Sequence, residues 1–88
     1  MEQNNIVNIL LADDHHLVRD GIKSLLLKYG EFKIVGEGAD GIEILKILET
    51  SEQKVDLVLA DINMPHMNGL ELSQAIAHKF PTTKVVML

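Results

Sequence analysis

The sequence contains no cysteine among its 88 residues. This absence excludes disulfide bonds, a thiol nucleophile, and zinc or iron–sulfur sites held by thiolates. Tryptophan is also absent, and the one tyrosine and two phenylalanines are too few to build a platform on which nucleic-acid bases could stack. Lys and Arg number eight against thirteen Asp and Glu, which gives a net charge of −5. This balance disfavours direct binding to a phosphate backbone.

Long hydrophobic runs are missing as well. No stretch approaches the roughly 20 apolar residues that a membrane-spanning helix needs, and no cationic segment precedes an apolar one at the N-terminus as in a signal peptide. We therefore expect a cytoplasmic protein that makes no membrane contact. An apolar fraction of 47% and a charged fraction of 24% are ordinary for a globular protein. We predict a single domain, or part of one, over residues 1–88.

Short apolar runs recur along the chain at 6–12, 32–36, 55–60 and 84–88. Nearly continuous runs of this length are typical of strands that are buried on both faces of a parallel sheet. Helical spacing of apolar residues fills the intervals between the runs. We expect Gly30 to end the first helix in a left-handed conformation, and Pro81 follows the third helix.

The helical intervals contain three apolar stripes: Val18, Ile22, Leu25, Leu26 and Tyr29; Gly41, Ile44, Leu45 and Leu48; and Leu72, Ala75, Ile76 and Phe80. The resulting order is βαβαβαβ with short connections. Parallel strands joined through helices close by right-handed crossovers, so helices cover both faces of the sheet. The sequence therefore predicts an α/β fold, a doubly wound parallel sheet.

Acidic residues follow two of the predicted strands. Asp13 and Asp14 come after the first run, and Asp61 comes after the third. Ligands of such sheets bind outside the carboxyl ends of the strands, and carboxylates that converge there repel one another unless a cation lies among them. An all-oxygen set suits Mg²⁺, and a carboxylate beside Mg²⁺ can attack a phosphoryl group. A simpler interpretation is that these residues only cap a helix or begin a loop.

Two segments, LLADDHHLVRDGI and LVLADINMPHMNGLEL, resemble the receiver domains of two-component response regulators, most closely the NarL/FixJ (LuxR-type) subfamily. The acidic pair follows the first strand, and the third strand ends in D-x-x-M-P-x-M-x-G with every position filled. The resemblance extends from Ile6 to Leu88. It implies the flavodoxin-like receiver fold, which is also the fold of the CheY-like receivers.

The resemblance also implies roles for individual residues. Asp61 would be the phosphoacceptor for a histidine kinase. Asp14 and Asp61 would bind Mg²⁺ directly together with the backbone carbonyl of Asn63, and Asp13 would join through a water molecule. The remaining motif positions would shape the loop, and we expect a positive φ at the last of them; these residues are Met64, Pro65 and Gly69.

Two histidines and a leucine near the acidic pair allow more than one interpretation. His15 and His16 beside two aspartates could suggest a transition-metal site. Consecutive residues entering a helix point in different directions, however, so we expect both histidines to face solvent at the rim of the site. Leu17 is a candidate contact for the kinase, and a lone exposed apolar residue is an equal alternative.

The sequence departs from the family pattern at its end. In the family a helix, a strand and a further helix follow the fourth strand, and this region carries a Ser or Thr and a Lys that contact the phosphoryl group. No residue here can be assigned those switch roles, because the sequence ends at Leu88. We therefore expect an incomplete receiver that reaches DNA only through a separate output domain, and that self-associates through the edge formed by residues 84–88.

These features favour a phosphorylation-controlled signalling switch that regulates transcription, rather than an enzyme with turnover. One alternative is a Mg²⁺-dependent aspartyl-phosphate hydrolase of the haloacid-dehalogenase type. Such enzymes carry a second Asp two residues after the nucleophile, where this sequence has Asn63. The other alternative is an interaction module that no longer switches.

Overall fold

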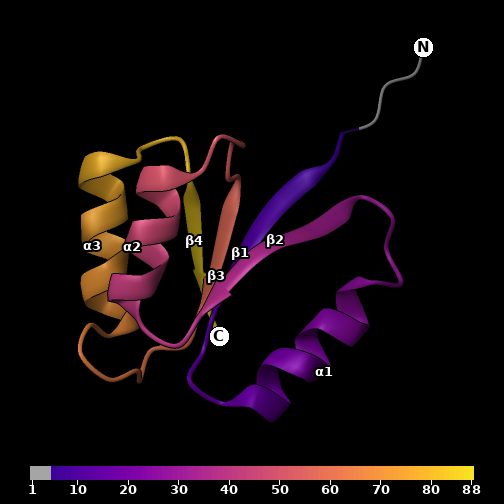
Figure 1. The fold of residues 1–88 in the computed structure, drawn as a ribbon, viewed down its shortest axis with the longest axis horizontal. Coiled ribbons are helices and arrows are strands. Elements are labelled where there is room, and N and C mark those ends of the chain that lie inside the picture. Colours follow the sequence, from indigo (N-terminus) through magenta and orange to yellow (C-terminus); the bar gives the residue numbers. More distant parts are fainter. Residues whose placement is uncertain (1–4) are drawn as a thin grey trace.

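Four strands alternate with three helices in the computed structural model, which describes residues 5–88 (Figure 1). The first four residues of the predicted 1–88 domain lie outside the described part. The elements are β1 (Val7–Ala12), α1 (His16–Leu26), β2 (Phe32–Gly38), α2 (Gly41–Thr50), β3 (Leu57–Ala60), α3 (Gly69–Lys79) and β4 (Lys84–Met87). The strands fall on the four apolar runs of the sequence, so the predicted βαβαβαβ order is confirmed.

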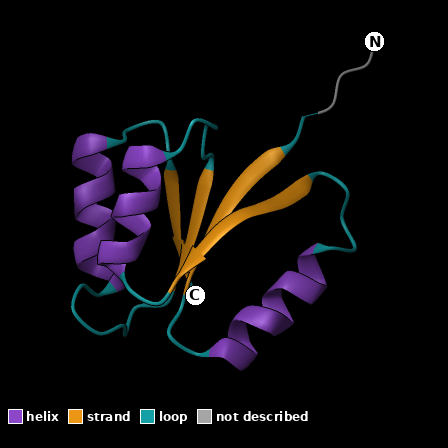
Figure 2. Ribbon diagram, viewed as in Figure 1, coloured by secondary structure: helices purple, strands orange, loops and turns teal. Residues whose placement is uncertain are grey.

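The four strands form one parallel sheet in the order β2-β1-β3-β4 (Figure 2). Because β1 and β3 are neighbours, their carboxyl ends lie side by side, with Ala12 paired to Ala60. The pairing of β1 with β2 shifts register between Ile9 and Leu10. This topology confirms the doubly wound α/β class and the flavodoxin-like receiver fold.

The hydrophobic core lies between the sheet and two of the helices. Figure 1 shows α2 and α3 side by side on one side of the sheet, with α1 on the other. Ile44 of α2 and both Leu72 and Ile76 of α3 are fully buried against the sheet. The strands contribute buried residues to the same cluster: Leu10, Ala12, Val58 and Ala60. Burial of these side chains supplies the main apolar contribution to stability.

Helix α1 departs from the prediction in two ways. It ends at Leu26 rather than at Gly30, because the chain tightens into turns in which the N–H of Tyr29 donates to the carbonyl of Leu26 at 3.0 Å. Gly30 does not adopt a positive φ. The predicted stripe is also poorly buried, with Val18 and Leu25 exposed. Tyr29 lies in the turn after the helix, where its ring meets the edge of Phe32 with the centroids 6.1 Å apart.

Charged side chains also connect α1 to the sheet. Arg19 is the one buried residue of this helix. Its guanidinium Nη1 lies 3.5 Å from Glu37 of β2, and Lys23 Nζ lies 2.8 Å from the other oxygen of Glu37. The hydrogen bond to Glu37 raises the pKa of Lys23 above its ordinary value. Glu37 of β2 therefore joins α1 to the sheet through two ion pairs.

Within residues 5–88, none of the helices is long and apolar enough to cross a membrane.

Candidate functional site

The acidic residues begin where the two central strands end. The backbone N–H of Asp61 donates to the carbonyl of Ala12 at 2.9 Å, and the N–H of Asp13 donates to the carbonyl of Gly38 at 3.1 Å. These hydrogen bonds continue the parallel ladders one residue beyond β3 and β1. The backbone thus fixes the positions from which the carboxylates leave the sheet.

The three carboxylates predicted to meet at this edge do lie together. Asp13, Asp14, His15 and Asp61 each offer one oxygen or nitrogen atom, and these four atoms lie within 4.8 Å of one another. Asp13 is only 3% exposed, whereas the side chain of Asp14 is one-third exposed. A compact set dominated by carboxylate oxygens has the chemistry that a hard divalent cation requires.

His15 is drawn into the cluster to an extent that the sequence did not predict. Its backbone N–H donates to Asp13 Oδ1 at 2.8 Å, and its ring Nδ1 lies 2.9 Å from the same oxygen and 3.0 Å from Asp14 Oδ1. The hydrogen bond to Asp13 and the negative charge of Asp14 raise the pKa of His15. Solvent exposure of the ring was expected and is found, at 64%, but the ring nitrogen faces the carboxylates.

The extended backbone at the helix N-cap explains this orientation. His15 occupies the N-cap position of α1 with φ −107° and ψ 111°, and its side chain makes no capping hydrogen bond. The acidic side chains do not cap the helix either, since Asp13 accepts from the N-cap residue itself. His16, the first helical residue, turns away so that its ring Nδ1 lies 2.9 Å from the Arg19 guanidinium. Only His15 of the two histidines therefore contacts the acidic cluster.

The loop after Asp61 is anchored in the core. Met64 is buried, and Pro65 and Asn63 are exposed. The backbone N–H of Asn63 donates to Asp61 Oδ1 at 3.3 Å. His66 has a positive φ of 65°. The side chain of Met64 therefore packs in the core and anchors the loop, while the backbone of Asn63 stays beside Asp61.

The structure requires glycine at position 69 for a reason other than the expected positive φ. No glycine among residues 5–88 has a positive φ, so that prediction is wrong. A Cβ atom at Gly69 would instead lie 2.5 Å from the carbonyl oxygen of Asp61 and 3.0 Å from the Cα of Ile62. The N–H of Gly69 donates to the carbonyl of Ile62 at 2.9 Å. Glycine is needed here because the start of α3 touches the backbone of Asp61.

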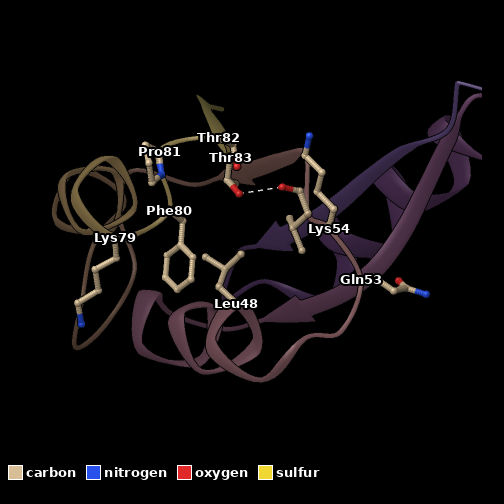
Figure 3. Close-up of a pocket in the computed structure, with 9 residues that line it drawn as sticks. Leu48, Gln53, Lys54, Lys79, Phe80, Pro81, Thr82 and Thr83 are labelled. Carbon is tan, nitrogen blue, oxygen red and sulfur yellow. Dashed lines mark hydrogen bonds between the residues drawn. The ribbon is translucent and has the colours of Figure 1, made fainter.

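A hollow at the opposite end of the sheet lacks this concentration of charge. It lies where the chain enters β3 and β4, between Leu48 and Phe80 on one side and Lys54 on the other (Figure 3). The hydroxyl of Thr83 donates to the carbonyl of Val55 at 2.8 Å across its floor. None of the residues that line the hollow is acidic, so it offers no carboxylate to a cation. We therefore place the candidate site at the acidic end.

Comparison with known proteins gives a single family. Residues 9–88 match the response regulator receiver domain. The chain is 41% identical over 83 residues to the response regulator UvrY of Escherichia coli and 42% identical over 82 residues to the response regulator VraR of Staphylococcus aureus. These alignments cover 94% and 93% of the chain but only 37% and 38% of the relatives. The chain thus spans little more than a third of the length of these curated relatives.

Solved structures agree with this match. The receiver domain of RcsB from Escherichia coli superposes with a TM-score of 0.85 at 28% identity, over 96% of this chain and 65% of that one. The receiver domain of the putative response regulator NarL from Mycobacterium tuberculosis gives a TM-score of 0.85 at 30% identity, over 94% and 65% of the two chains. The sequence match, the sheet order and the acidic edge lead to one conclusion: the chain belongs to the response regulator receiver domain family, among relatives of the NarL/FixJ type.

Proposed function

We propose that this receiver takes a phosphoryl group from a histidine kinase onto Asp61. The observation that carries the proposal is the meeting of Asp13, Asp14 and Asp61 at the carboxyl ends of two adjacent parallel strands. Asp61 is partly exposed, so a phosphoryl donor can approach it. Among the described residues, its accepted hydrogen bond is at Oδ1, from Asn63. This leaves Oδ2 as the oxygen that attacks phosphorus while the bond to the kinase histidine nitrogen breaks.

The same residues suit Mg²⁺. Asp14 and Asp61 would bind the ion directly with the backbone carbonyl of Asn63, and Asp13 would hold a water molecule bound to it. When bound, the ion supplies positive charge that offsets the repulsion between the carboxylates and the incoming phosphoryl oxygens. The donor set of the site fits this role, because the acidic atoms lie within 4.8 Å of one another and oxygen is the ligand that Mg²⁺ prefers.

We infer that the partners are a histidine kinase and, through a separate output domain, DNA. Leu17 is 86% exposed at the start of α1, immediately after the acidic cluster, and is our candidate for contact with the kinase. RcsB, a structural neighbour, has been solved as dimers bound to DNA. We place the receiver in the cytoplasm, where it acts as a switch that controls transcription rather than as an enzyme with turnover.

Phosphorylation with acetyl phosphate and Mg²⁺ tests the assignment of Asp61. We expect the intact mass to show one added phosphoryl group that hydroxylamine removes, and we expect Asp61→Asn to gain none. Asp20→Asn is the matched control, because this carboxylate is exposed on α1 away from the cluster. Full phosphorylation of Asp61→Asn would contradict the assignment. Repeated turnover of a phosphate ester would favour the hydrolase alternative, in which Asn63 stands where the general acid is required.

Mg²⁺ titration followed by amide chemical shifts tests the metal site. Asp14→Ala should weaken Mg²⁺ binding more than Asp13→Ala, because Asp14 is expected to bind the ion directly and Asp13 through water. Without metal, Asp14→Ala removes one of the mutually repelling carboxylates, so the protein should lose little stability or gain some. Equal Mg²⁺ affinity in the wild type and in Asp14→Ala would contradict a site at this position.

A further inference from the structure

His15 already uses the hydrogen-bonding capacity of one cluster oxygen. A carboxylate oxygen offers about two lone-pair sites. Asp13 Oδ1 lies close to two nitrogen atoms of His15. The backbone nitrogen is 2.8 Å away and ring Nδ1 is 2.9 Å away. An oxygen so occupied has no lone pair to offer to an ion or to a water molecule bound to that ion.

The same ring nitrogen also reaches Asp14, the carboxylate proposed to bind Mg²⁺ directly. Nδ1 lies 3.0 Å from Asp14 Oδ1, so it bridges the carboxylates of Asp13 and Asp14. As a donor between two acceptors, the ring offsets the repulsion that these groups would otherwise feel. The ring thus stabilises the two neighbouring aspartates in the position where a bound cation would do so.

The ring is free to leave. Its side chain is 64% exposed, and its polar contacts within the cluster are with one oxygen each of Asp13 and Asp14. Rotation about the side-chain bonds would move Nδ1 into solvent while the backbone hydrogen bond to Asp13 stays in place. The cost of displacement is therefore the loss of these two polar contacts and not a repacking of the core.

We propose that the His15 ring occupies the acidic cluster in the metal-free protein and that Mg²⁺ must displace it in order to bind. This inference rests on the proposed Mg²⁺ site. His15 then lowers the affinity for the ion and, in the absence of the ion, stabilises the cluster. Removal of the His15 ring should therefore raise the affinity for Mg²⁺ and lower the stability of the metal-free protein. Loss of a metal ligand would instead lower the affinity, and loss of a purely structural residue would not raise it.

The test compares His15→Ala with His16→Ala. His16 is the neighbouring ring and contacts Arg19 instead of the aspartates. At one fixed pH, Mg²⁺ is titrated while the amide shifts around Asp61 and the ring signals of His15 are recorded. We expect His15→Ala to bind Mg²⁺ about three- to tenfold more tightly, the range expected for release of one or two exposed polar contacts. We expect His16→Ala to stay within about twofold of wild type, and His15→Gln, whose amide can still donate, to lie between.

The outcomes distinguish the inference from the function on which it rests. Ring signals of wild-type His15 that shift as Mg²⁺ saturates, together with tighter binding and lower metal-free stability in His15→Ala, support displacement. Weaker or unchanged Mg²⁺ binding in His15→Ala overturns it while leaving the metal site intact. Absence of Mg²⁺ binding in the wild type and in all three variants overturns the metal site itself, and the inference with it.

Discussion

At Gly69 the first turn of α3 comes into contact with the backbone of the proposed phosphoacceptor. Gly69→Ala should destabilise the protein by about 1–3 kcal/mol, the usual range for a side chain forced into a packed position, because its Cβ would meet the Asp61 carbonyl. It should also shift the Asp61 amide. Urea unfolding and an amide spectrum measure the two effects.

Gly30→Ala provides the matched control for this change. Nothing lies within 4 Å of a Cβ at Gly30, and its φ is not positive. Alanine there should leave stability unchanged or raise it by up to about 1 kcal/mol through the unfolded chain. Equal unfolding free energies for Gly69→Ala and Gly30→Ala would show that the close approach to Asp61 has no energetic weight.

The sequence predicts the site well where the backbone alone decides. Asp13, Asp14 and Asp61 follow strands that are adjacent in the sheet, so their meeting follows from topology. The orientation of His15 is different, because it depends on side-chain torsions and on an extended N-cap that no periodicity encodes. The steric role of Gly69 was equally hidden, since the contact joins two segments whose distance only the folded loop determines.

Among the elements, α1 is joined to the sheet by the ion pairs to Glu37 as well as by its partly buried apolar residues. Glu37→Ala removes one ion-pair partner from each of Lys23 and the buried Arg19; the Nε of Arg19 has no hydrogen-bond partner within residues 5–88. We expect a measurable loss of stability, because the buried guanidinium of Arg19 then keeps its contact with His16 but loses its ion pair across to β2. Glu49→Ala, which removes only an exposed contact 3.9 Å from Lys79, is the control. Similar unfolding free energies for the two variants would refute this role of Glu37.

The Lys23–Glu37 pair adds a pH dependence to the same comparison. Because the hydrogen bond to Glu37 raises the pKa of folded Lys23 above 10.5, its stabilising contribution is complete below that value. The contribution is lost as pH rises through the raised pKa. The stability gap between wild type and Glu37→Ala should therefore narrow only in that alkaline range, as denaturant titrations at several pH values would show.

Periodicity located the elements because buried strands and amphipathic helices carry distinct patterns. The stripes of α2 and α3 are buried as predicted, since two helices and a sheet face close over them. The stripe of α1 has the same pattern, yet Val18 and Leu25 remain exposed. A pattern reports which face of a helix is apolar, and burial also requires an opposing surface, which the sequence of one helix does not contain.

At the scale of the whole molecule, β4 forms an edge of the described sheet. It pairs with β3 on one side, and Val86 and Leu88 are 46% and 52% exposed. An apolar edge strand offers unpaired backbone groups to another chain. We predict that the 88-residue chain self-associates at micromolar concentration, and that Val86→Lys reduces this association severalfold in sedimentation experiments.

A lysine placed away from β4 is the control for Val86→Lys, because it tests whether added positive charge alone reduces association. Gln74 is exposed on α3, so Gln74→Lys adds the same charge away from the edge and should leave the association unchanged. A wild-type chain that stays monomeric over the whole concentration range would contradict the edge as an association site. Equal effects of the two lysines would attribute the change to net charge alone.

The uneven attachment of the helices has a kinetic consequence. Amide protons in the strands and in α2 and α3 should exchange with solvent mainly when the whole domain unfolds, whereas those of α1 should exchange through a smaller and more frequent opening. His15 stands at the N-terminal end of α1. Each detachment of that helix would move the imidazole away from the aspartates and expose them briefly, so the opening rate of α1 would limit the rate at which an ion enters by this route.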